Sequence, residues 1–387
     1  MPQAGTSRTV PHVIVIGIGG VGAFALRALA RRGVSVLGIE AFQVGHDRGS
    51  SHGGTRVFRH AYFEHADYVP LLRHSTDVFR ELGVASGRPL IEDCGTLLIG
   101  KQSCPVVRAA ATAAERHQVP VEMVSASEVA RRYPQFAIPS DHHALFEPGG
   151  GFVRPESSIR AAVDEALAHG ARLREGLRVQ DIQEHADGVL VRTSQGDLQA
   201  DRVVVTAGAW TSLLLPDLAP RLRTTRQVQG WIEPRDPALG APANLPTWFV
   251  VRDDAPPVYG IPSDPRSPGP PRVKVALHGR SEPLDPDAPR RPVDDADRAA
   301  LMSAVKQWMP GLEGDLVDAK TCIYTSTPDE HIIVDHAPGH RRVCVVAGLS
   351  GHGFKMTPAL GRAAADLTLN GTSELPIGFL SADRFGA

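Results

Sequence analysis

The sequence has few cysteines and almost no net charge. Its four cysteines are Cys94, Cys104, Cys322 and Cys344, and no two of them have the C-x-x-C spacing of a zinc site or a redox pair. We therefore expect no bound metal, and a reduced cytoplasmic protein is the simplest interpretation. The formal net charge is −2, so the composition indicates neither a positively charged surface for binding nucleic acid nor an acidic tail. A nucleic-acid partner is not expected.

Long apolar runs are also absent. No stretch of 18 consecutive apolar residues occurs, whereas a membrane-spanning helix needs about 20. Residues 1–11 are polar and lack the apolar core of a signal peptide. We therefore expect no membrane span, and the 387 residues are enough for two domains of ordinary size.

The first clear motif lies near the N-terminus. Residues 13–16 are an uninterrupted apolar run, which predicts a strand buried on both faces. A G-x-G-x-x-G loop follows at 17–22, then a predicted helix at 23–32 and a second predicted strand at 34–39, which ends at Glu40. This order and spacing is the βαβ fingerprint of dinucleotide binding.

Each residue type in the fingerprint has a physical reason. One glycine permits a tight turn, another lets the backbone approach a pyrophosphate, and a third lets helix and strand pack closely. The N-terminus of the helix offers free N–H groups to the phosphates. Glu40 lies 18 residues after Gly22 and is placed to accept hydrogen bonds from a ribose. It would repel a 2′-phosphate, so FAD or NAD is favoured over NADP. The expected cofactor-binding residues are Gly17, Gly19, Gly20, Gly22 and Glu40. The alternative is a glycine-rich turn with only a structural role.

The rest of the chain mixes helices and strands. Helices are expected at 68–82 with Gly83 as the C-terminal cap, at 105–117, after the capping box that opens at Ser125, and at 155–169, 299–309 and 358–369. Strands are expected at 96–99, 189–191, 203–205, 248–251, 273–277 and 343–347. Residues 85–145 look like an insertion into the nucleotide-binding domain, and strand-like runs between 227 and 278 suggest a second sheet.

Five stretches resemble the monomeric sarcosine oxidase family, which includes N-methyltryptophan oxidase and pipecolate oxidase. They are the opening fingerprint, SHGGTRVFRHAY at 51–62, TAGAW at 206–210, CIYTSTPDEH at 322–331 and GLSGHGFK at 348–355. Together they span nearly the whole chain in the family's order and spacing. The chain is therefore identified as a member of this family of FAD-dependent amine oxidases.

The resemblance implies a fold and a division into domains. The family is similar to D-amino-acid oxidase, an α/β fold of two domains: a Rossmann-type FAD-binding domain and a substrate domain built around a mixed β-sheet. We therefore expect residues 1–84, 147–225 and 318–387 to form the FAD-binding domain, and residues 85–146 and 226–317 to form the substrate domain. Members often work as monomers, and the same is expected here.

The resemblance also implies a reaction. Members oxidise the C–N bond of small amino acids, mostly secondary amines such as sarcosine, N-methyltryptophan or a cyclic imino acid. Hydride passes to flavin N5, dioxygen reoxidises the flavin to give hydrogen peroxide, and the imine product hydrolyses or rearranges. The expected partners are therefore an amino-acid substrate and dioxygen.

Cys322 matches the family cysteine that forms a thioether to the 8α-methyl group of the flavin. By chemistry alone, a cysteine beside β-branched residues is usually a small buried hydrophobe, and Cys94, Cys104 and Cys344 keep that interpretation. The Tyr-x-x-x-Pro-Asp-Glu-His context after Cys322 favours attachment as 8α-S-cysteinyl FAD. A thioether at that carbon would make the flavin a stronger oxidant.

Several basic residues match the family's active site. Lys274 matches the oxygen-activating lysine, because a fixed cation near the flavin stabilises superoxide in a dry site. His278 lies four residues on, would face the same side of a strand, and matches a histidine that positions substrate. Arg59 and Lys355 match the pair that binds the substrate carboxylate, and Arg56 matches the arginine nearer the flavin ring. The structural alternatives are a solvent-facing lysine, a sheet histidine and salt bridges.

The remaining matches concern the walls of the site and the flavin. Tyr259 and Tyr324 match tyrosines that line the active site, although either could be a packed core aromatic. The glycine-rich backbone at 351–353 would let N–H groups meet the pyrimidine edge of the flavin. Further expected cofactor-binding residues are His52, Thr55, Ala207, Gly208, Trp210, Gly351, His352, Gly353 and Lys355.

The chain departs from the family pattern in two places. Ser51 and Gly54 stand where the family often has a histidine and an aspartate, which affects local flavin contacts. The loop at 264–271 is unusually rich in proline. If it borders the entrance it changes which side chain is admitted, so sarcosine itself is not assumed.

Three rival functions stay open. The first is a flavin oxidase of specialised metabolism that converts a cyclic imino acid to a desaturated or aromatic product. The second is a flavin dehydrogenase that uses another electron acceptor, against which Lys274 argues. The third is a non-catalytic, flavin-bound regulator or scaffold.

Overall fold

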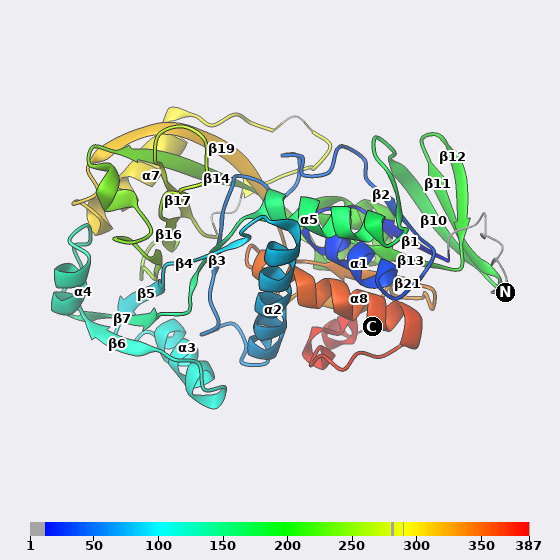
Figure 1. The fold of residues 1–387 in the computed structure, drawn as a ribbon, viewed down its shortest axis with the longest axis horizontal. Helices are drawn as coiled ribbons and strands as arrows, with labels where there is room; N and C mark the ends of the chain where they lie inside the picture. The colour runs from blue at the N-terminus through cyan, green and yellow to red at the C-terminus, as the bar shows by residue number, and fades with distance from the viewer. Residues whose placement is uncertain (1–11, 280–281, 289, 387) are drawn as a thin grey trace.

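Two large β-sheets lie toward opposite ends of the molecule (Figure 1). The computed structural model describes residues 12–279, 282–288 and 290–386. Within these ranges, no helix combines the length and the apolar character needed to cross a bilayer.

The first sheet has the strand order β20-β21-β13-β1-β2-β9. Its strands are β1 (Val13–Ile16), β2 (Val36–Ile39), β9 (Arg172–Arg174), β13 (Arg202–Val205), β20 (Ile333–His336) and β21 (Val343–Ala347). β1 pairs in parallel with β13 and β2, and β20 adds an antiparallel edge beside β21. This largely parallel sheet is the arrangement that the fingerprint requires.

Successive side chains of β1 enter two different layers. Val13 and Val15 pack with four helices, whereas Ile14 and Ile16 pack with a three-stranded antiparallel sheet. The helices are α1 (Gly20–Ala30), α2 (Tyr68–Ser86), α5 (Pro155–Ala168) and α8 (Thr357–Asn370). The small sheet consists of β10 (Val179–His185), β11 (Gly188–Thr193) and β12 (Gly196–Ala200). Because both faces of the parallel sheet are covered, its central strands β1, β2 and β21 are buried along their whole length.

The second large sheet is mixed and has the order β18-β14-β17-β16-β15-β5-β7-β6, with β19 also paired to β14. Its strands are β5 (Thr96–Lys101), β6 (Glu122–Ser125), β7 (His142–Glu147), β14 (Arg223–Pro234), β15 (Thr247–Val250), β16 (Val258–Ile261), β17 (Val273–Leu277), β18 (Glu282–Pro283) and β19 (Gly314–Ser326). Helix α7 (Asp295–Trp308) packs on one face, against side chains that include Trp248, Val273 and Val275. The opposite face of this sheet carries residues of the site described below.

Shorter elements connect these layers. They are the antiparallel strands β3 (Arg56–Phe58), β8 (Gly151–Val153) and β4 (Ile91–Asp93), and the helices α3 (Pro105–Arg116), α4 (Ala126–Arg132) and α6 (Thr211–Leu214). The strand β3 matters most for function, because Arg56 lies on it and Arg59 follows directly after it.

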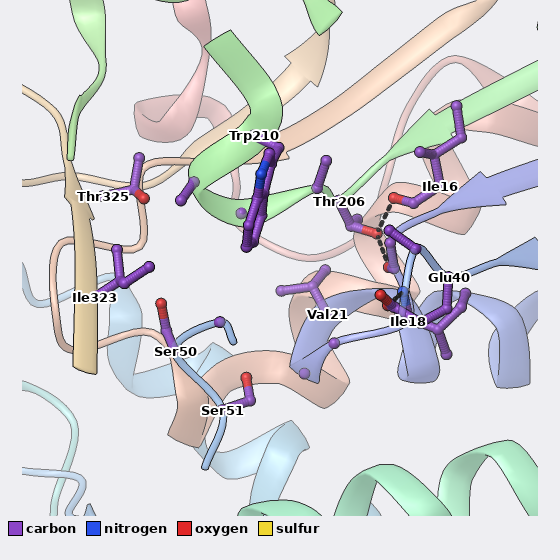
Figure 2. Close-up of a pocket in the computed structure, with 18 of the residues that line it drawn as sticks. Ile16, Ile18, Val21, Glu40, Ser50, Ser51, Thr206, Trp210, Ile323 and Thr325 are labelled. Atoms are coloured by element: carbon purple, nitrogen blue, oxygen red, sulfur yellow. Dashed lines mark hydrogen bonds between the residues drawn. The ribbon is translucent and has the colours of Figure 1, made fainter. Parts of the chain in front are cut away.

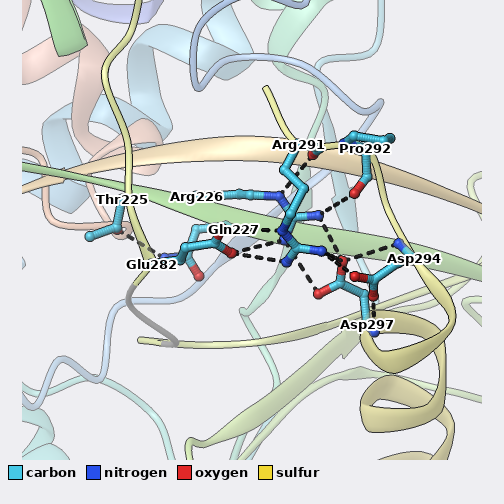
Figure 3. A network of polar contacts seen from close by, with 8 residues as sticks. All are labelled: Thr225, Arg226, Gln227, Glu282, Arg291, Pro292, Asp294 and Asp297. Carbon is cyan, nitrogen blue, oxygen red and sulfur yellow. Dashed lines mark hydrogen bonds and ion pairs between the residues drawn. The ribbon is translucent and has the colours of Figure 1, made fainter. Parts of the chain in front are cut away.

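A buried ion pair ties α7 to β14 (Figure 3). Arg226 donates to both carboxylate oxygens of Asp297, with Nη2–Oδ2 at 2.7 Å and Nη1–Oδ1 at 3.3 Å. The same guanidinium donates to the carbonyl oxygens of Arg291 and Pro292, each at 3.0 Å. Asp297 also completes the capping box with Asp294 at the start of α7. One charge pair therefore fixes the helix and the segment before it to the sheet.

The sequence predictions of element type are confirmed for β1 and β21, whose bounds match as well. The predicted cap at Gly83 is wrong, because α2 continues to Ser86 and ends at Gly87, which has a φ of 64°. Gly83 serves close packing instead, since a Cβ there would lie 3.2 Å from the carbonyl oxygen of Arg88. The fingerprint helix begins at Gly20, earlier than predicted, because Gly20 and Gly22 take part in its first turn.

The proposed domain division stays a prediction. The strands β14 and β19 pair along most of their length, and each runs across one of the predicted boundaries, at 225/226 and 317/318 respectively. Any division of the chain therefore has to assign this pair of strands as a unit.

Candidate active site

A cavity of about 390 Å³ follows the loop after β1. Figure 2 shows Ile18 and Glu40 at one end, Ser50 and Ile323 toward the other, and the indole of Trp210 between them. The cavity is also lined by the predicted residues Gly17, Gly19, Gly20, Ala207, Gly208, Arg56, Tyr324, Gly351 and Gly353. The opening fingerprint and the later motifs therefore meet at one elongated site.

Two glycines of the fingerprint are required by their surroundings. Gly17 has a φ of +85°, and a Cβ there would lie 2.7 Å from the carbonyl oxygen of Thr206. A Cβ at Gly22 would lie 1.9 Å from the carbonyl oxygen of Gly17. The hydroxyl of Thr206 donates to the carbonyl oxygens of Ile16 and Gly17, at 3.0 Å and 2.7 Å. The loop is thus held tightly against β13, with its backbone open to the cavity.

Glu40 is buried and positioned by two backbone N–H groups. Its carboxylate accepts from the N–H of Ile18 at 2.8 Å and from that of Phe42 at 3.1 Å. Burial alone would raise the pKa of Glu40, but the neighbouring His46 and the backbone donors together lower it. A carboxylate fixed here is suited to accept hydrogen bonds from the diol of a ribose.

Sequence analysis missed part of the cavity wall. Phe42, Arg178, Val179 and Gln180 line it, and the rings of Phe42 and Trp210 are 5.7 Å apart. Residues 178–180 lie at the start of β10, more than a hundred residues from the fingerprint. Only the pairing of strands brings them to the cavity, so no local signal could have identified them.

One face of the second sheet holds most of the predicted catalytic residues. In the β14 ladders, Thr225 is opposite Tyr324, Gln227 is opposite Cys322, and Trp231 is opposite Lys274. Residues directly opposite in an antiparallel pair project to the same face, and alternate residues along a strand share that face. The same register places Tyr259 opposite Ala276 and opposite Phe249. Tyr324, Cys322, Lys274, Tyr259 and Phe249 therefore share the face that does not pack on α7.

Cys322 is buried on this face beside Arg56. Its Sγ lies 3.8 Å from Nη2 of Arg56 and 3.8 Å from the carbonyl oxygen of Ser50. Arg56 also donates to the carbonyl oxygens of Thr55 and Ser50, at 2.8 Å and 2.6 Å. A guanidinium in a fixed position thus lies beside the sulfur atom of Cys322.

Lys274 is only 2% exposed. Its Nζ donates to the carbonyl oxygen of Thr55 at 2.7 Å and lies 5.5 Å from the ring centroid of Trp231. Burial lowers the pKa of Lys274 well below its usual value, and the nearby charge of Arg56 adds to this effect. Nζ of Lys274 is thus held in a dry setting, where burial opposes the charged form that its predicted role requires.

His278 follows β17 directly and lies among aromatic rings. Its Nδ1 is 3.3 Å from the hydroxyl of Tyr324, and its ring centroid is 5.6 Å from Phe249 and 6.4 Å from Tyr259. Burial lowers the pKa of His278 to about 4, so the ring is neutral at neutral pH. Burial also raises the pKa values of Tyr259 and Tyr324, so both hydroxyls stay protonated.

Arg59 faces an acidic partner that sequence analysis missed. Its Nη2 lies 3.2 Å from each carboxylate oxygen of Glu64, and its Nη1 donates to the carbonyl oxygen of Ala61 at 2.7 Å. The guanidinium lies over Phe63 and Tyr62, 4.2 Å and 4.4 Å from the ring centroids. Arg59 is therefore rigidly held, and in this structure its fork is directed at Glu64.

Lys355 is the second predicted carboxylate-binding cation, and it is buried. Its Nζ donates to the hydroxyl of Tyr62 at 3.2 Å and to the carbonyl oxygen of His352 at 2.9 Å. Burial and the charge of Arg59 lower the pKa of Lys355 to about 7, although Glu64 opposes this shift. His352 is held by Tyr62, whose hydroxyl is 2.8 Å from its Nδ1. His352 thus supports Lys355 and does not line the cavity.

The loop with the two departures from the family pattern is anchored by a residue of α5. Glu156 accepts from the N–H groups of Gly53 and Gly54, at 2.7 Å and 3.1 Å. Ser51 lines the cavity, whereas His52 is buried behind it, and burial together with Arg56 lowers the pKa of His52 to about 3. The loop therefore keeps a defined shape without the aspartate that the family often has.

Comparison with known proteins identifies the class. A family model described as FAD dependent oxidoreductase matches residues 12–367, and the chain belongs to this family. The monomeric sarcosine oxidase of Streptomyces avermitilis is 37% identical over 379 residues, which cover 97% of this chain and 98% of that protein. The N-methyl-L-tryptophan oxidase of Yersinia pestis is 32% identical over 375 residues, which cover 96% and 99%.

Similarity also extends to solved structures. The open form of NikD, described as an unusual amino acid oxidase essential for nikkomycin biosynthesis, matches with a TM-score of 0.84 at 25% identity. The match covers 96% of this chain and 97% of that one. The predicted family and fold class are therefore confirmed, and the protein is an FAD-dependent oxidoreductase of the sarcosine oxidase type.

The residues of the cavity fit FAD. Side chains at Gly17 and Gly22 would clash with backbone oxygen atoms, and Glu40 is fixed where a ribose needs an acceptor. Arg56 and Tyr324 line the far end of the cavity and contact Cys322 and His278 respectively. The dinucleotide cavity therefore leads directly to the sheet face with the predicted catalytic residues.

Proposed function

We propose that the protein oxidises the C–N bond of an amino acid with a secondary amine, either an N-methyl amino acid or a cyclic imino acid. The observation that supports this most directly is the shared sheet face. Cys322, Lys274, Tyr259 and Tyr324 lie on this face, and Tyr324 also lines the cavity. When bound, FAD supplies a two-electron acceptor that dioxygen reoxidises to give hydrogen peroxide.

The substrate carboxylate would be held by Lys355 and Arg59. Both cations are buried, and Glu64 already presents a carboxylate to Arg59 at 3.2 Å. A bound substrate would offer a second carboxylate to the same cluster. The planar fork of Arg59 suits two carboxylate oxygens, and Lys355 adds a point charge.

The same cations would favour the neutral form of the substrate amine. Arg56, Arg59, Lys274 and Lys355 surround the site with positive charge, which lowers the pKa of a bound amine. The neutral ring of His278 and the hydroxyl of Tyr324 would orient the substrate by hydrogen bonds. No strong side-chain base is then needed. A kcat/KM that shows no ionisation of the substrate between neutral and alkaline pH would argue against this part.

The cofactor would be attached through Cys322, as 8α-S-cysteinyl FAD. The position of Sγ supports this proposal, because it lies 3.8 Å from Nη2 of Arg56, a residue that lines the cavity. Lys274, held at the carbonyl oxygen of Thr55, would stabilise the anion formed as dioxygen is reduced. We further propose that the enzyme acts as a monomer in the cytoplasm.

The accepted side chain is expected to be apolar. Phe249 lies 5.6 Å from His278 and 5.9 Å from Phe63, and Phe63 supports Arg59. An aromatic wall beside the carboxylate-binding cations suits a ring or a hydrophobic group. This observation favours the second candidate, an oxidase of cyclic imino acids, over sarcosine itself.

The test is a panel of amines mixed anaerobically with the holoenzyme. N-methyl and cyclic amino acids should bleach the flavin absorbance, whereas the matched amines that lack the carboxylate should bleach it at least 100-fold more slowly, because they forgo two charge-assisted contacts. Equal rates with and without the carboxylate would contradict the assigned orientation. More than one dioxygen consumed per substrate would identify a desaturating or aromatising oxidase, and bleached flavin that dioxygen fails to reoxidise would identify a dehydrogenase.

A further inference from the structure

Trp231 and Lys274 lie opposite each other on neighbouring antiparallel strands. The ladder between β14 and β17 pairs them directly, so both side chains project to the same face of the sheet. The Nζ of Lys274 is 5.5 Å from the centroid of the Trp231 ring. This is within the distance at which the face of an indole attracts an ammonium ion.

Lys274 has few other partners for its charge. Its Nζ donates to the carbonyl oxygen of Thr55 at 2.7 Å, and no carboxylate in the described part of the chain is within salt-bridge distance of it. The charged and titratable groups that face it are Arg56 and His52 from the loop and β3, Glu156 from α5, and Cys322 from β19. Arg56 opposes protonation of Lys274, and only Glu156 and Cys322 favour it.

We propose that Trp231 is a positioning residue that holds the ammonium of Lys274 and keeps it protonated where dioxygen is reduced. The inference rests on the proposed function, in which Lys274 is the cation that assists this step. Two electrons and two protons pass to dioxygen and give hydrogen peroxide, and the first electron produces an anion. Trp231 does not touch the reacting atoms, and its effect passes through Lys274.

The geometry explains why the aromatic ring matters. A carbonyl oxygen fixes one N–H group of the ammonium, and the π face of Trp231 faces the charge from the adjacent strand. An aliphatic side chain at this position would fill space but would offer no negative face to the cation. Gly53 brings the loop close on another side, where a Cβ would lie 3.4 Å from Nζ. Lys274 is therefore enclosed.

The direct readout is the pKa of Lys274. The chain contains only five lysines, so labelling lysine with ¹³C at Cε gives few NMR signals, and the signal lost in Lys274→Met identifies the residue. Removing the ring disfavours the charged form, so Trp231→Leu should lower the pKa of Lys274 by about one unit. Trp231→Phe keeps a smaller π face and should restore most of that difference.

The second readout is the reaction with dioxygen after photoreduction of the flavin, which needs no substrate. The protonated form of Lys274 speeds the reaction of the reduced flavin with dioxygen. The rate of reoxidation therefore falls as the pH rises through the pKa of Lys274. Trp231→Leu should move this fall to lower pH by about one unit and slow reoxidation about 10-fold on the alkaline side. At a pH below the pKa of Lys274 in both enzymes, where the lysine keeps its charge, reduction by amine should change less than 2-fold. Added to Lys274→Met, Trp231→Leu should have no further effect.

Several outcomes separate the inference from the function on which it rests. If Lys274→Met reoxidises as fast as the native enzyme, the proposed role of Lys274 fails, and the inference fails with it. If Lys274 matters but Trp231→Leu leaves both the pKa and the rate unchanged, only the inference is overturned. It is also overturned if Trp231→Leu slows the Lys274→Met enzyme equally. Trp231→Met serves as a second aliphatic variant if Trp231→Leu does not fold.

Discussion

Binding of a carboxylate should weaken sharply as the pH rises above 7. Burial and Arg59 lower the pKa of Lys355 to about 7, so the free enzyme loses this proton in a range where most lysines keep it. A bound carboxylate favours the ammonium form and therefore raises the pKa of Lys355. Binding then takes up one proton above pH 7, and affinity is lost as pH rises through that value.

The size of the effect follows from the enclosed geometry. At about 4 Å and an effective dielectric constant near 20, two opposite charges attract by about 4 kcal/mol, which corresponds to about 3 pKa units. The dissociation constant should therefore rise about tenfold per pH unit well above pH 7, and about 50-fold between pH 7 and pH 9, because half of Lys355 is already deprotonated at pH 7. The neighbouring His278 and His352 have pKa values of about 4 and do not titrate in this window.

The assay is the change in flavin absorbance when acetate binds to the holoenzyme at a series of pH values. Lys355→Arg keeps a cation that stays protonated, so its dissociation constant should be nearly independent of pH. Lys355→Met should bind weakly at every pH. A flat profile for the native enzyme, or the same slope in Lys355→Met, would refute the assignment of the titrating group to Lys355.

Three further predictions address attachment, cofactor binding and stability. Cys322→Ser should leave FAD bound but not attached, so acid precipitation should release the yellow colour into the supernatant instead of the pellet; colour in the pellet of the variant would contradict this attachment point. Gly22→Ala should yield protein with at least 10-fold less bound FAD, measured by absorbance after gel filtration, because its Cβ would lie 1.9 Å from the carbonyl oxygen of Gly17. Asp297→Ala should lower the free energy of unfolding in urea by about 3 kcal/mol, because buried Arg226 loses its nearest carboxylate and keeps only the more exposed Glu282, at 3.6 Å. The exposed pair between Arg131 and Glu128 is the matched control, and Arg131→Ala should leave the free energy of unfolding nearly unchanged.

The nucleotide half of the site was predictable from sequence because its requirements are local. A glycine that must adopt a φ of +85° and a carboxylate at the end of the next strand occupy fixed places in a short segment. The helices were predictable from apolar periodicity. The end of α2 was not, because Gly83 packs closely against the backbone of Arg88, and this contact leaves no trace in the local pattern.

The catalytic half depended on the family resemblance, because the sheet register decides which side chains meet. Trp231 and Phe249 face the site only because their strands pair with Lys274 and Tyr259. Glu64 lies five residues after Arg59 in an irregular loop, and nothing in the sequence marks it as the partner of that arginine. These residues are the ones that shape the site beyond what the family motifs describe.

The most direct test of the central claim is to reduce the flavin anaerobically with one amino acid at a time and then to reoxidise it with air. N-methyl or cyclic amino acids are mixed with the holoenzyme under argon, the flavin spectrum is recorded, and air is then admitted. The account predicts full bleaching, full return of the oxidised spectrum and one hydrogen peroxide per flavin reduced. A flavin that no secondary amino acid bleaches would contradict it, and the protein would then be a flavin-binding member of the family without this activity.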